Sequence, residues 1–260
     1  MIQTVPDILA RIVAEKHREL QETAADPQLE RFASDSIAHR RDFRAALLAD
    51  PPAVIAEIKK GSPSKGIFNA DFRPAEIARR YEEGGAAALS VLTDRSFFFG
   101  SFEDLQAARA KVKVPILRKD FTISERHIFE AAAYGADAIL LIAAILDSSE
   151  IRRFRALANE LQLASLVEVH NEEELAKAMD AGADILGVNN RDLHTFQVSL
   201  DTSLRLAERI PSGAVKVSES GIHSGSDVKL LQGAGYNAFL VGEHLMLADS
   251  PSAALRTLRS

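Results

Sequence analysis

Residues 52–66 read PAVIAEIKKGSPSKG and join a short apolar run to a glycine-bounded loop. The run is rich in β-branched residues, a pattern typical of a buried strand. Glu57 and Lys59 stand two positions apart, so both side chains leave the same face of that strand. A carboxylate and an ammonium that point together into a protein interior are unfavourable unless they pair or take part in chemistry. A salt bridge at a strand end would explain one such pair, but comparable residues recur on later strands.

Short apolar runs alternate with helical patterns from residue 53 onward. The runs occupy residues 53–59, 87–93, 115–120, 137–143, 164–169, 184–190, 214–220 and 237–242. Helices are predicted near residues 74–83, 101–111, 124–133, 147–161, 171–180, 200–209, 224–233 and 251–258. Such alternation indicates parallel strands joined by crossover helices. Glycines that end the helices, at positions 84–85, 135, 182 and 235, suit left-handed C-terminal caps.

Eight strands and eight helices predict an α/β fold, a (β/α)8 TIM barrel. An open doubly wound sheet is the alternative, but it usually carries a Gly-rich phosphate loop after its first strand. The loop GSPSKG at 61–66 does not match that fingerprint.

The N-terminal residues 1–50 are predicted to form a helical extension. Apolar residues from Ile8 to Leu20 keep a helical period, Asp26-Pro27 breaks the helix, and a second helical piece covers residues 42–48. We therefore expect a single domain, residues 1–260, with the extension at 1–50 and the barrel at 51–260. Because eight units can close a barrel by themselves, we also expect the barrel to fold without residues 1–46.

Composition excludes several functional classes. The net charge is −6, which argues against non-specific nucleic-acid binding, and the absence of cysteine excludes disulfides and thiolate metal sites. No segment is long and apolar enough to cross a bilayer. We expect a cytoplasmic protein with a small-molecule partner, no nucleic-acid or membrane partner, and no metal.

Polar residues stand at most of the predicted strand ends. In a barrel of this kind the functional site is built where the strands end. The strand ends carry Glu57 and Lys59, Thr93, Lys119, Glu168, Asn189 and Arg191, Ser218 and Ser220, and Gly242, whereas the fourth end is apolar. This many polar residues at the strand ends of one rim would stabilise a fold poorly. We therefore interpret them as functional.

The rim favours proton transfer by lysine and glutamate. The serines have no histidine at a spacing that indicates a nucleophile, and the histidines are too scattered for a metal site. We interpret His170 as structural or exposed, on the opposite face from Glu168.

Two late loops suggest a phosphate site. Ser220-Gly221 ends the seventh strand, and a short extra helix is predicted at 242–246. Barrels frequently bind phosphate there, on backbone N–H groups. Lys59, Lys60, Lys65, Lys119 and Arg191 lie at or near strand ends, and their gathering predicts a locally positive cleft.

Seven motifs resemble the indole-3-glycerol phosphate synthase family. They are AEIKKGSPSKG, SVLTD followed by FFFGS, ILRKDF, LVEV, GVNNRDL, VSESGI and FLVGEHLM, and the match runs in order from about residue 5 to the C-terminus. The resemblance implies that a carboxyphenylamino-deoxyribulose 5-phosphate is closed to indole-3-glycerol phosphate with loss of carbon dioxide and water, without a cofactor. It further implies that the helical extension lies over the active-site end.

The resemblance also implies roles for individual residues. Lys119 matches a general acid, Glu168 and Lys59 fit the dehydration steps, and Glu57 orients Lys59; which lysine serves which step is left open. Asn189, Arg191 and Ser220 match positions that hold substrate hydroxyls or carboxylate. Phe98, Phe121 and Leu240 match the walls around the aromatic ring, and Ser62, Gly221, Gly242 and Glu243 match positions around substrate and phosphate.

Two rival functions share parts of this pattern. A phosphoribosyl-anthranilate isomerase would use the same fold for a sugar rearrangement, and a non-catalytic sugar-phosphate binding module would not need two lysines and two glutamates on one rim. Nothing after the eighth helix suggests a fused second enzyme, and we expect a monomer.

Overall fold

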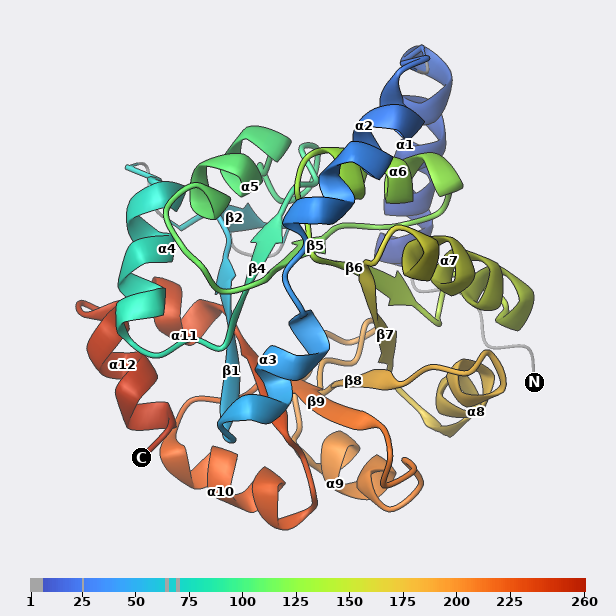
Figure 1. Cartoon of the computed structure of the whole chain (residues 1–260). Coiled ribbons are helices and arrows are strands. Elements are labelled where there is room, and N and C mark those ends of the chain that lie inside the picture. Colours follow the sequence, from blue (N-terminus) through green and yellow to red (C-terminus); the bar gives the residue numbers. More distant parts are fainter. Residues whose placement is uncertain (1–6, 25, 64–65, 69–70) are drawn as a thin grey trace.

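The protein is described by a computed structural model that covers residues 7–24, 26–63, 66–68 and 71–260. Ser64 and Lys65 of the predicted loop lie outside these residues. Eight strands close into a parallel barrel in the order β1-β10-β9-β8-β7-β6-β5-β4, which confirms the predicted fold class. Figure 1 shows the helices arranged around this ring of strands.

The barrel strands begin and end within two residues of the predicted runs. They are β1 (Ala53–Ile58), β4 (Ala88–Leu92), β5 (Ile116–Lys119), β6 (Ala138–Ile142), β7 (Ala164–Val169), β8 (Ile185–Asn189), β9 (Val215–Glu219) and β10 (Ala238–Val241). Two further strands, β2 (Gly61–Ser62) and β3 (Gly66–Ile67), form a small antiparallel hairpin within the loop after β1.

The helices around the barrel match the predicted set. They are α4 (Pro74–Glu83), α5 (Phe102–Arg109), α6 (Glu125–Ala133), α7 (Ser148–Glu160), α8 (Glu172–Asp180), α9 (Asp201–Ala207), α10 (Gly225–Gly233), the short α11 (Glu243–Met246) and α12 (Pro251–Leu258).

Local sequence signals explain where these helices begin and end. The side chains of Ser101, Ser124, Asp147, Asn171 and Ser224 accept a hydrogen bond from a backbone N–H in the first turn of α5, α6, α7, α8 and α10. Glycines with positive φ, at positions 85, 135, 182 and 235, follow four helices and turn the chain toward the next strand, as predicted.

Strand alternation divides the core into two parts. Side chains that point outward, such as Val54 and Val167, pack against the surrounding helices. Side chains that point inward, such as Ile55, Leu117 and Leu166, fill the barrel interior. The inward positions are apolar at the amino-terminal end of the strands and become charged at the carboxyl end, which locates the candidate site.

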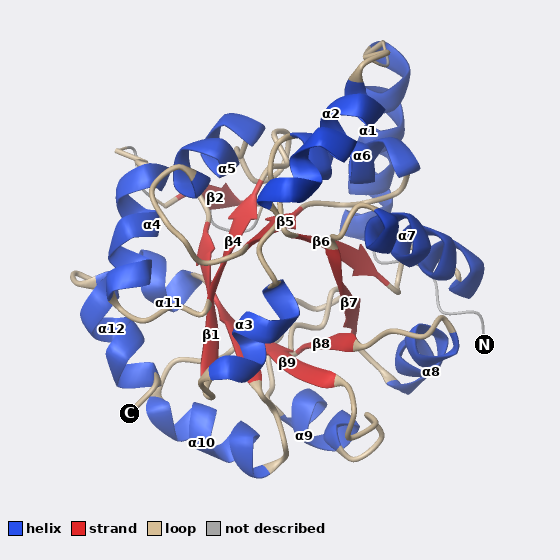
Figure 2. Ribbon diagram, viewed as in Figure 1, coloured by secondary structure: helices blue, strands red, loops and turns tan. Residues whose placement is uncertain are grey.

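The extension forms α1 (Asp7–Glu22), α2 (Leu29–Asp35), a short 3-10 helix η1 (Ser36–His39) and α3 (Phe43–Ala49). The sequence predicted α1 and α3 but not α2 and η1. Helix α2 packs on α6, and α1 contributes Leu9 and Ile12 to the interior core. Figure 2 shows α3 lying across the middle of the ring of strands.

Helix α3 closes the barrel at the amino-terminal end of its strands. Phe43 and Leu47 are buried among the interior side chains, including Ala53 and Ile55 of β1. A truncation up to Ala46 would remove Phe43 and leave Leu47 without its helix. This burial argues against our expectation that the barrel folds without residues 1–46.

Among the described residues, none of the helices combines the length and apolar character required to span a membrane.

Two adjacent leucines of α3 test this closure. Leu47 is 0% exposed and Leu48 is 40% exposed, so the pair differs in burial but not in residue type. We expect Leu47→Ala to lower the free energy of unfolding by about 2–5 kcal/mol, through lost burial and a cavity at the barrel end. The matched control, Leu48→Ala, should change it by about 0.5 kcal/mol or less. Urea unfolding of both variants measures these changes. Equal losses of unfolding free energy would show that α3 does not close the core.

Candidate active site

A cavity of about 410 Å³ opens at the carboxyl ends of the barrel strands. Inward side chains of five strands meet there: Glu57 of β1, Lys119 of β5, Glu168 of β7, Asn189 of β8 and Glu219 of β9. The apolar wall of the cavity includes Leu140 and Ile142 of β6, as expected from the apolar end of the fourth strand.

All fourteen predicted site residues line this one cavity. They are Glu57, Lys59, Ser62, Phe98, Lys119, Phe121, Glu168, Asn189, Arg191, Ser220, Gly221, Leu240, Gly242 and Glu243. Their individual roles stay predictions.

Lys119 is the centre of the charged layer. Its Nζ donates to Glu168 Oε2 at 2.8 Å and to Glu219 Oε2 at 3.2 Å. Burial disfavours the ammonium, but the carboxylates of Glu168 and Glu219 outweigh it and raise the pKa of Lys119 above its usual range. Lys119 is therefore held protonated, as a general acid or a cationic hydrogen-bond donor must be.

Glu168 and Glu219 share Lys119, but their pKa values shift in opposite directions. Burial raises the pKa of Glu168, yet Lys119 and His170 outweigh it and lower that pKa below its usual range. Burial and the charge of Glu168 raise the pKa of Glu219 to about 7, against the opposing effect of Lys119. A carboxyl that titrates near neutral pH is well suited to exchange protons with a substrate.

Sequence reasoning missed Glu219. It selected Ser218 and Ser220 at the end of this strand, but Ser218 points outward, where its Oγ accepts from Asn190 Nδ2 at 3.0 Å. The signal was present: Val215 and Val217 are inward-facing, so alternation places Glu219 inside with them. The same phase error affects Thr93, which is not part of the cavity lining and whose hydroxyl donates to Asp120 Oδ2.

Glu57 and Lys59 pair as predicted. Lys59 Nζ lies 2.7 Å from Glu57 Oε1, and the side chains are 16% and 7% exposed. Lys59 also lies 5.7 Å above the ring of Phe68. The pair therefore holds an ammonium at the mouth of the cavity.

Two glycines make room for the carboxylates. A Cβ on Gly187 of β8 would overlap the carboxylate of Glu219, and a Cβ on Gly242 would overlap that of Glu57. The sequence assigned Gly242 to a phosphate site, and its packing beside Glu57 gives a second reason for a glycine there.

The cavity is not predominantly positive. Lys60 is not part of its lining, and Lys59, Lys119 and Arg191 face the lining acids Asp120, Glu57, Glu168, Glu219 and Glu243. Lys59, Lys119 and Arg191 therefore gather in the cavity as predicted, but the described residues give no excess of positive charge, because the same strand ends also supply carboxylates.

Aromatic and apolar side chains form the outer walls. Phe98 and Phe121 lie with ring centroids 6.1 Å apart. Ile8, Leu9 and Ile12 of α1 complete the lining. The extension thus lies over the site, as the family resemblance implied.

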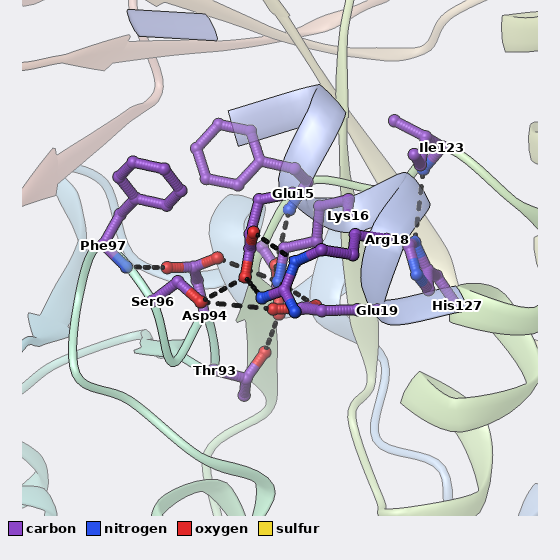
Figure 3. A network of polar contacts seen from close by, with 12 residues as sticks. Glu15, Lys16, Arg18, Glu19, Thr93, Asp94, Ser96, Phe97, Ile123 and His127 are labelled. Atoms are coloured by element: carbon purple, nitrogen blue, oxygen red, sulfur yellow. Dashed lines mark hydrogen bonds and ion pairs between the residues drawn. The ribbon is translucent and has the colours of Figure 1, made fainter. Parts of the chain in front are cut away.

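Lys16 of α1 ties the extension to the loops that carry the aromatic walls (Figure 3). Its side chain is 4% exposed, and its Nζ lies 2.8 Å from Asp94 Oδ2 and 3.2 Å from Asp120 Oδ1. Asp94 accepts from the backbone N–H groups of Phe97 and Phe98, and Asp120 accepts from that of Phe121. One buried ammonium therefore joins both loops, a contact that no sequence pattern indicated.

Burial and neighbouring charges together set the pKa values of Lys16 and His127 in this network. Burial lowers the pKa of Lys16, but Asp120 and Asp94 outweigh it and raise that pKa above its usual range. Burial and the charge of Arg118 lower the pKa of His127 to about 3, so His127 is neutral in this cluster.

Within the described ranges, no group of three or more acidic or histidine side chains is arranged to hold a metal ion.

A closed parallel barrel with buried lysine–glutamate pairs at the carboxyl ends of its strands defines an acid–base enzyme of the (β/α)8 class. The model of the family described as indole-3-glycerol phosphate synthase matches residues 9–258, and the chain belongs to that family.

Relatives of that name align over almost the whole chain. The indole-3-glycerol phosphate synthase of Chromobacterium violaceum is 50% identical over 258 residues, covering 97% of this chain and 97% of that protein. The synthase of Polaromonas naphthalenivorans is 49% identical over 258 residues, covering 97% of this chain and 98% of that protein.

Solved structures with lower sequence identity share the fold. A 3-hexulose-6-phosphate synthase from Salmonella typhimurium superposes with a TM-score of 0.64 at 14% identity, covering 80% of this chain and 96% of that one. A thiamine phosphate pyrophosphorylase from Pyrococcus furiosus gives a TM-score of 0.61 at 19% identity, covering 80% and 93%. Identities this low show the fold alone.

Replacing Lys16 tests the tie between extension and site. Lys16→Met leaves Asp94 and Asp120 buried without this cation, so we expect a loss of about 3–5 kcal/mol in the free energy of unfolding. Because the loops that carry Phe98 and Phe121 lose a common partner, KM should rise by a larger factor than kcat falls. Lys229→Met, an exposed substitution on α10, is the control and should change neither. A Lys16→Met enzyme with normal KM would separate the network from substrate binding.

Proposed function

We propose that this protein acts as an indole-3-glycerol phosphate synthase, which closes 1-(2-carboxyphenylamino)-1-deoxyribulose 5-phosphate to indole-3-glycerol phosphate in tryptophan biosynthesis. The observation that carries the proposal is Lys119 held between Glu168 and Glu219 beside the Glu57–Lys59 pair, in a chain that belongs to this family. Carbon dioxide and water are the other products.

The reaction needs proton transfer at defined points. The aromatic carbon that bears the carboxylate attacks the ribulose ketone, and the ketone oxygen takes up a proton as the new carbon–carbon bond forms. Carbon dioxide then leaves, and its bonding electrons restore the aromatic ring. The new hydroxyl departs as water after gaining a second proton, and the neighbouring CH₂ carbon loses one to give the indole double bond.

Lys119 is our candidate for the first proton donor. It is protonated, lies at the centre of the cavity floor, and is oriented by two carboxylates. A cationic donor at the ketone oxygen stabilises the negative charge that develops there. Glu168, ionised beside Lys119, is suited to accept a proton during dehydration.

Lys59 is our candidate for the second catalytic ammonium, which would act in the dehydration step. Glu57 fixes its position through the 2.7 Å ion pair. Glu219 adds a carboxyl able to bind or release a proton near neutral pH.

The remaining lining residues suit an elongated anionic substrate. We propose that the phosphate lies at the loops after β9 and β10, near Gly221 and Gly242, where the backbone can approach closely. Asn189, Arg191 and Ser220 would hold the hydroxyls or the carboxylate, and Ser62 and the backbone of Glu243 would contribute beside the phosphate. Phe98, Phe121 and Leu240 would enclose the aromatic ring.

We further propose that residues 1–260 work as one domain and as a cytoplasmic monomer. The contribution of α1 to the cavity lining and the burial of Phe43 and Leu47 support a single unit.

Turnover of the anthranilate-derived ribulose phosphate tests the proposal directly. Purified protein should generate indole fluorescence together with carbon dioxide. A product with the aromatic carboxylate retained would indicate the isomerase alternative, and tight binding without any product would indicate a binding module.

Lys119→Met tests the proton donor. The side chains are similar in length, so the fold should persist, whereas kcat should fall by about 100-fold or more through loss of general acid catalysis. Lys111→Met, an exposed substitution just before β5, is the matched control and should keep full activity. Circular dichroism confirms folding, and near-normal turnover in folded Lys119→Met would remove Lys119 from the mechanism.

A further inference from the structure

His170 lies directly behind the catalytic carboxylate. It follows β7, in phase with Glu168, and its Nε2 lies 3.4 Å from Glu168 Oε1. The other oxygen of Glu168 accepts from Lys119 at 2.8 Å. The ring is 11% exposed and is not part of the cavity lining. The interpretation of His170 as facing away from Glu168 is therefore wrong, because residues two apart share one side of a strand.

A second carboxylate fixes the far side of the ring. His170 Nδ1 lies 2.9 Å from Glu174 Oε2 on α8, and the same oxygen accepts from the backbone N–H of His170 at 2.9 Å. Glu174 Oε1 accepts from Asn171 Nδ2 at 2.8 Å, and Asn171 caps α8. Glu174 is 8% exposed and is fully occupied by these contacts. Its orientation is thus set by the start of the helix.

This arrangement constrains the protonation of the ring. Glu174 Oε2 already accepts the backbone N–H, and as a carboxylate oxygen it also requires a proton on Nδ1. A neutral ring of that tautomer would point the lone pair of Nε2 at the carboxylate of Glu168. Two lone pairs facing each other in a buried site are repulsive, whereas a doubly protonated ring satisfies both carboxylates.

We propose that His170 is a positioning residue of the active site: a buried imidazolium that bridges Glu174 and Glu168 and holds Glu168 ionised and aimed at Lys119. The role rests on the proposed function, because it serves the proton transfers assigned there. His170 contacts neither the cavity nor, by this geometry, the reacting atoms, so it acts only through Glu168.

The need for such a cation follows from the charges on the floor of the cavity. Lys119 serves two carboxylates at once and gives up its proton during the reaction. Glu168 would then face Glu219 without a cationic partner in a site with little water, and it would take up a proton itself. His170 keeps a positive charge beside Glu168 throughout the cycle.

The electrostatics agree with this geometry. Burial lowers the pKa of His170, but the charges of Glu168 and Glu174 and the hydrogen bond with Glu174 outweigh it and raise that pKa to about 10. Among the described residues, Glu168 of β7 and Glu174 of α8 are the ionisable groups with the largest effect on the ring. With this pKa, the His170 ring carries a positive charge throughout the physiological pH range.

Histidine-ring NMR on the wild-type protein tests the charge directly. Spectra correlating ring protons with ring nitrogens should show both nitrogens of His170 protonated at about pH 8, where a histidine with an ordinary pKa near 6.5 is neutral. A His170 ring that loses a proton near pH 6.5, where an unperturbed histidine does, would overturn the proposal.

Two variants test the consequence for catalysis. His170→Gln keeps a hydrogen-bond donor but removes the charge, so the pKa of Glu168 should rise. The acidic limb of the kcat/KM profile should then move to higher pH by about 1 unit or more, which is about tenfold in rate on the acidic side. Glu174→Gln should lower the pKa of His170 and add an alkaline limb to kcat. Glu173→Gln, its exposed neighbour on α8, should leave both limbs unchanged.

Thermal unfolding and wild-type turnover separate the alternatives. A ring that only fills space would lower the melting temperature of His170→Gln without moving the acidic limb, and that result overturns the positioning role. If His170→Gln does not fold, Glu174→Gln and the wild-type NMR titration still decide. If the wild type makes no indole product, the proposed function fails, while the NMR titration still decides whether the imidazolium bridge exists.

Discussion

The structure depends on the placement of one ammonium, Lys119, between two carboxylates inside a closed barrel. An isolated charge at that depth would be unfavourable by several kcal/mol or more. Glu168 and Glu219 remove this penalty only because β5, β7 and β9 end at the same level of one ring. The barrel therefore does more than support the site. Its closure brings together charges that are 49 and 100 residues apart in the chain.

Each neighbouring feature compensates for a consequence of that arrangement. Gly187 leaves room for the carboxylate of Glu219, because the Cβ of any other residue at position 187 would overlap that carboxylate. Glu168 also faces a histidine that is fixed from behind by the first turn of α8. At the opposite end the side chains inside the barrel are apolar, and Phe43 and Leu47 of α3 close that end. The charged residues thus lie at the carboxyl ends of the barrel strands, and the apolar contacts with α3 lie at their amino-terminal ends.

Much of the fold could be predicted because its signals are local. Apolar runs and glycine C-caps lie within a few residues of the boundaries that they determine, so the predicted alternation of strands and helices was correct. The short hairpin β2–β3 and helices α2 and η1 were missed, since they carry no comparable periodicity. The polar site residues were predicted from the strand ends, which a closed barrel necessarily gathers, whereas Ser62, Phe98, Phe121 and Leu240 came from the family resemblance.

The errors at the site came from strand phase and from long-range pairing. Glu219 was missed and His170 was assigned to the wrong face, although strand alternation places Glu219 with the inward Val217 and places His170 on the same side as Glu168. Lys16 is different: its partners Asp94 and Asp120 are 78 and 104 residues further along the chain, and nothing local distinguishes it from the surface charges of α1. Such a residue becomes visible only when the extension is docked on the barrel.

The balance of charge in the cavity also changes how binding of an anionic substrate must be understood. Lys59 and Lys119 are already paired with Glu57, Glu168 and Glu219, so a phosphate or carboxylate does not enter a vacant positive field. In the proposed function, a substrate anion would replace one acidic partner of a lysine, and folding has already compensated the desolvation of both lysines. Glu219, with a pKa near 7, could take up a proton as that anion approaches and so reduce the repulsion. The same carboxyl would then be a proton source beside the substrate, which would link substrate capture to the proposed acid–base chemistry.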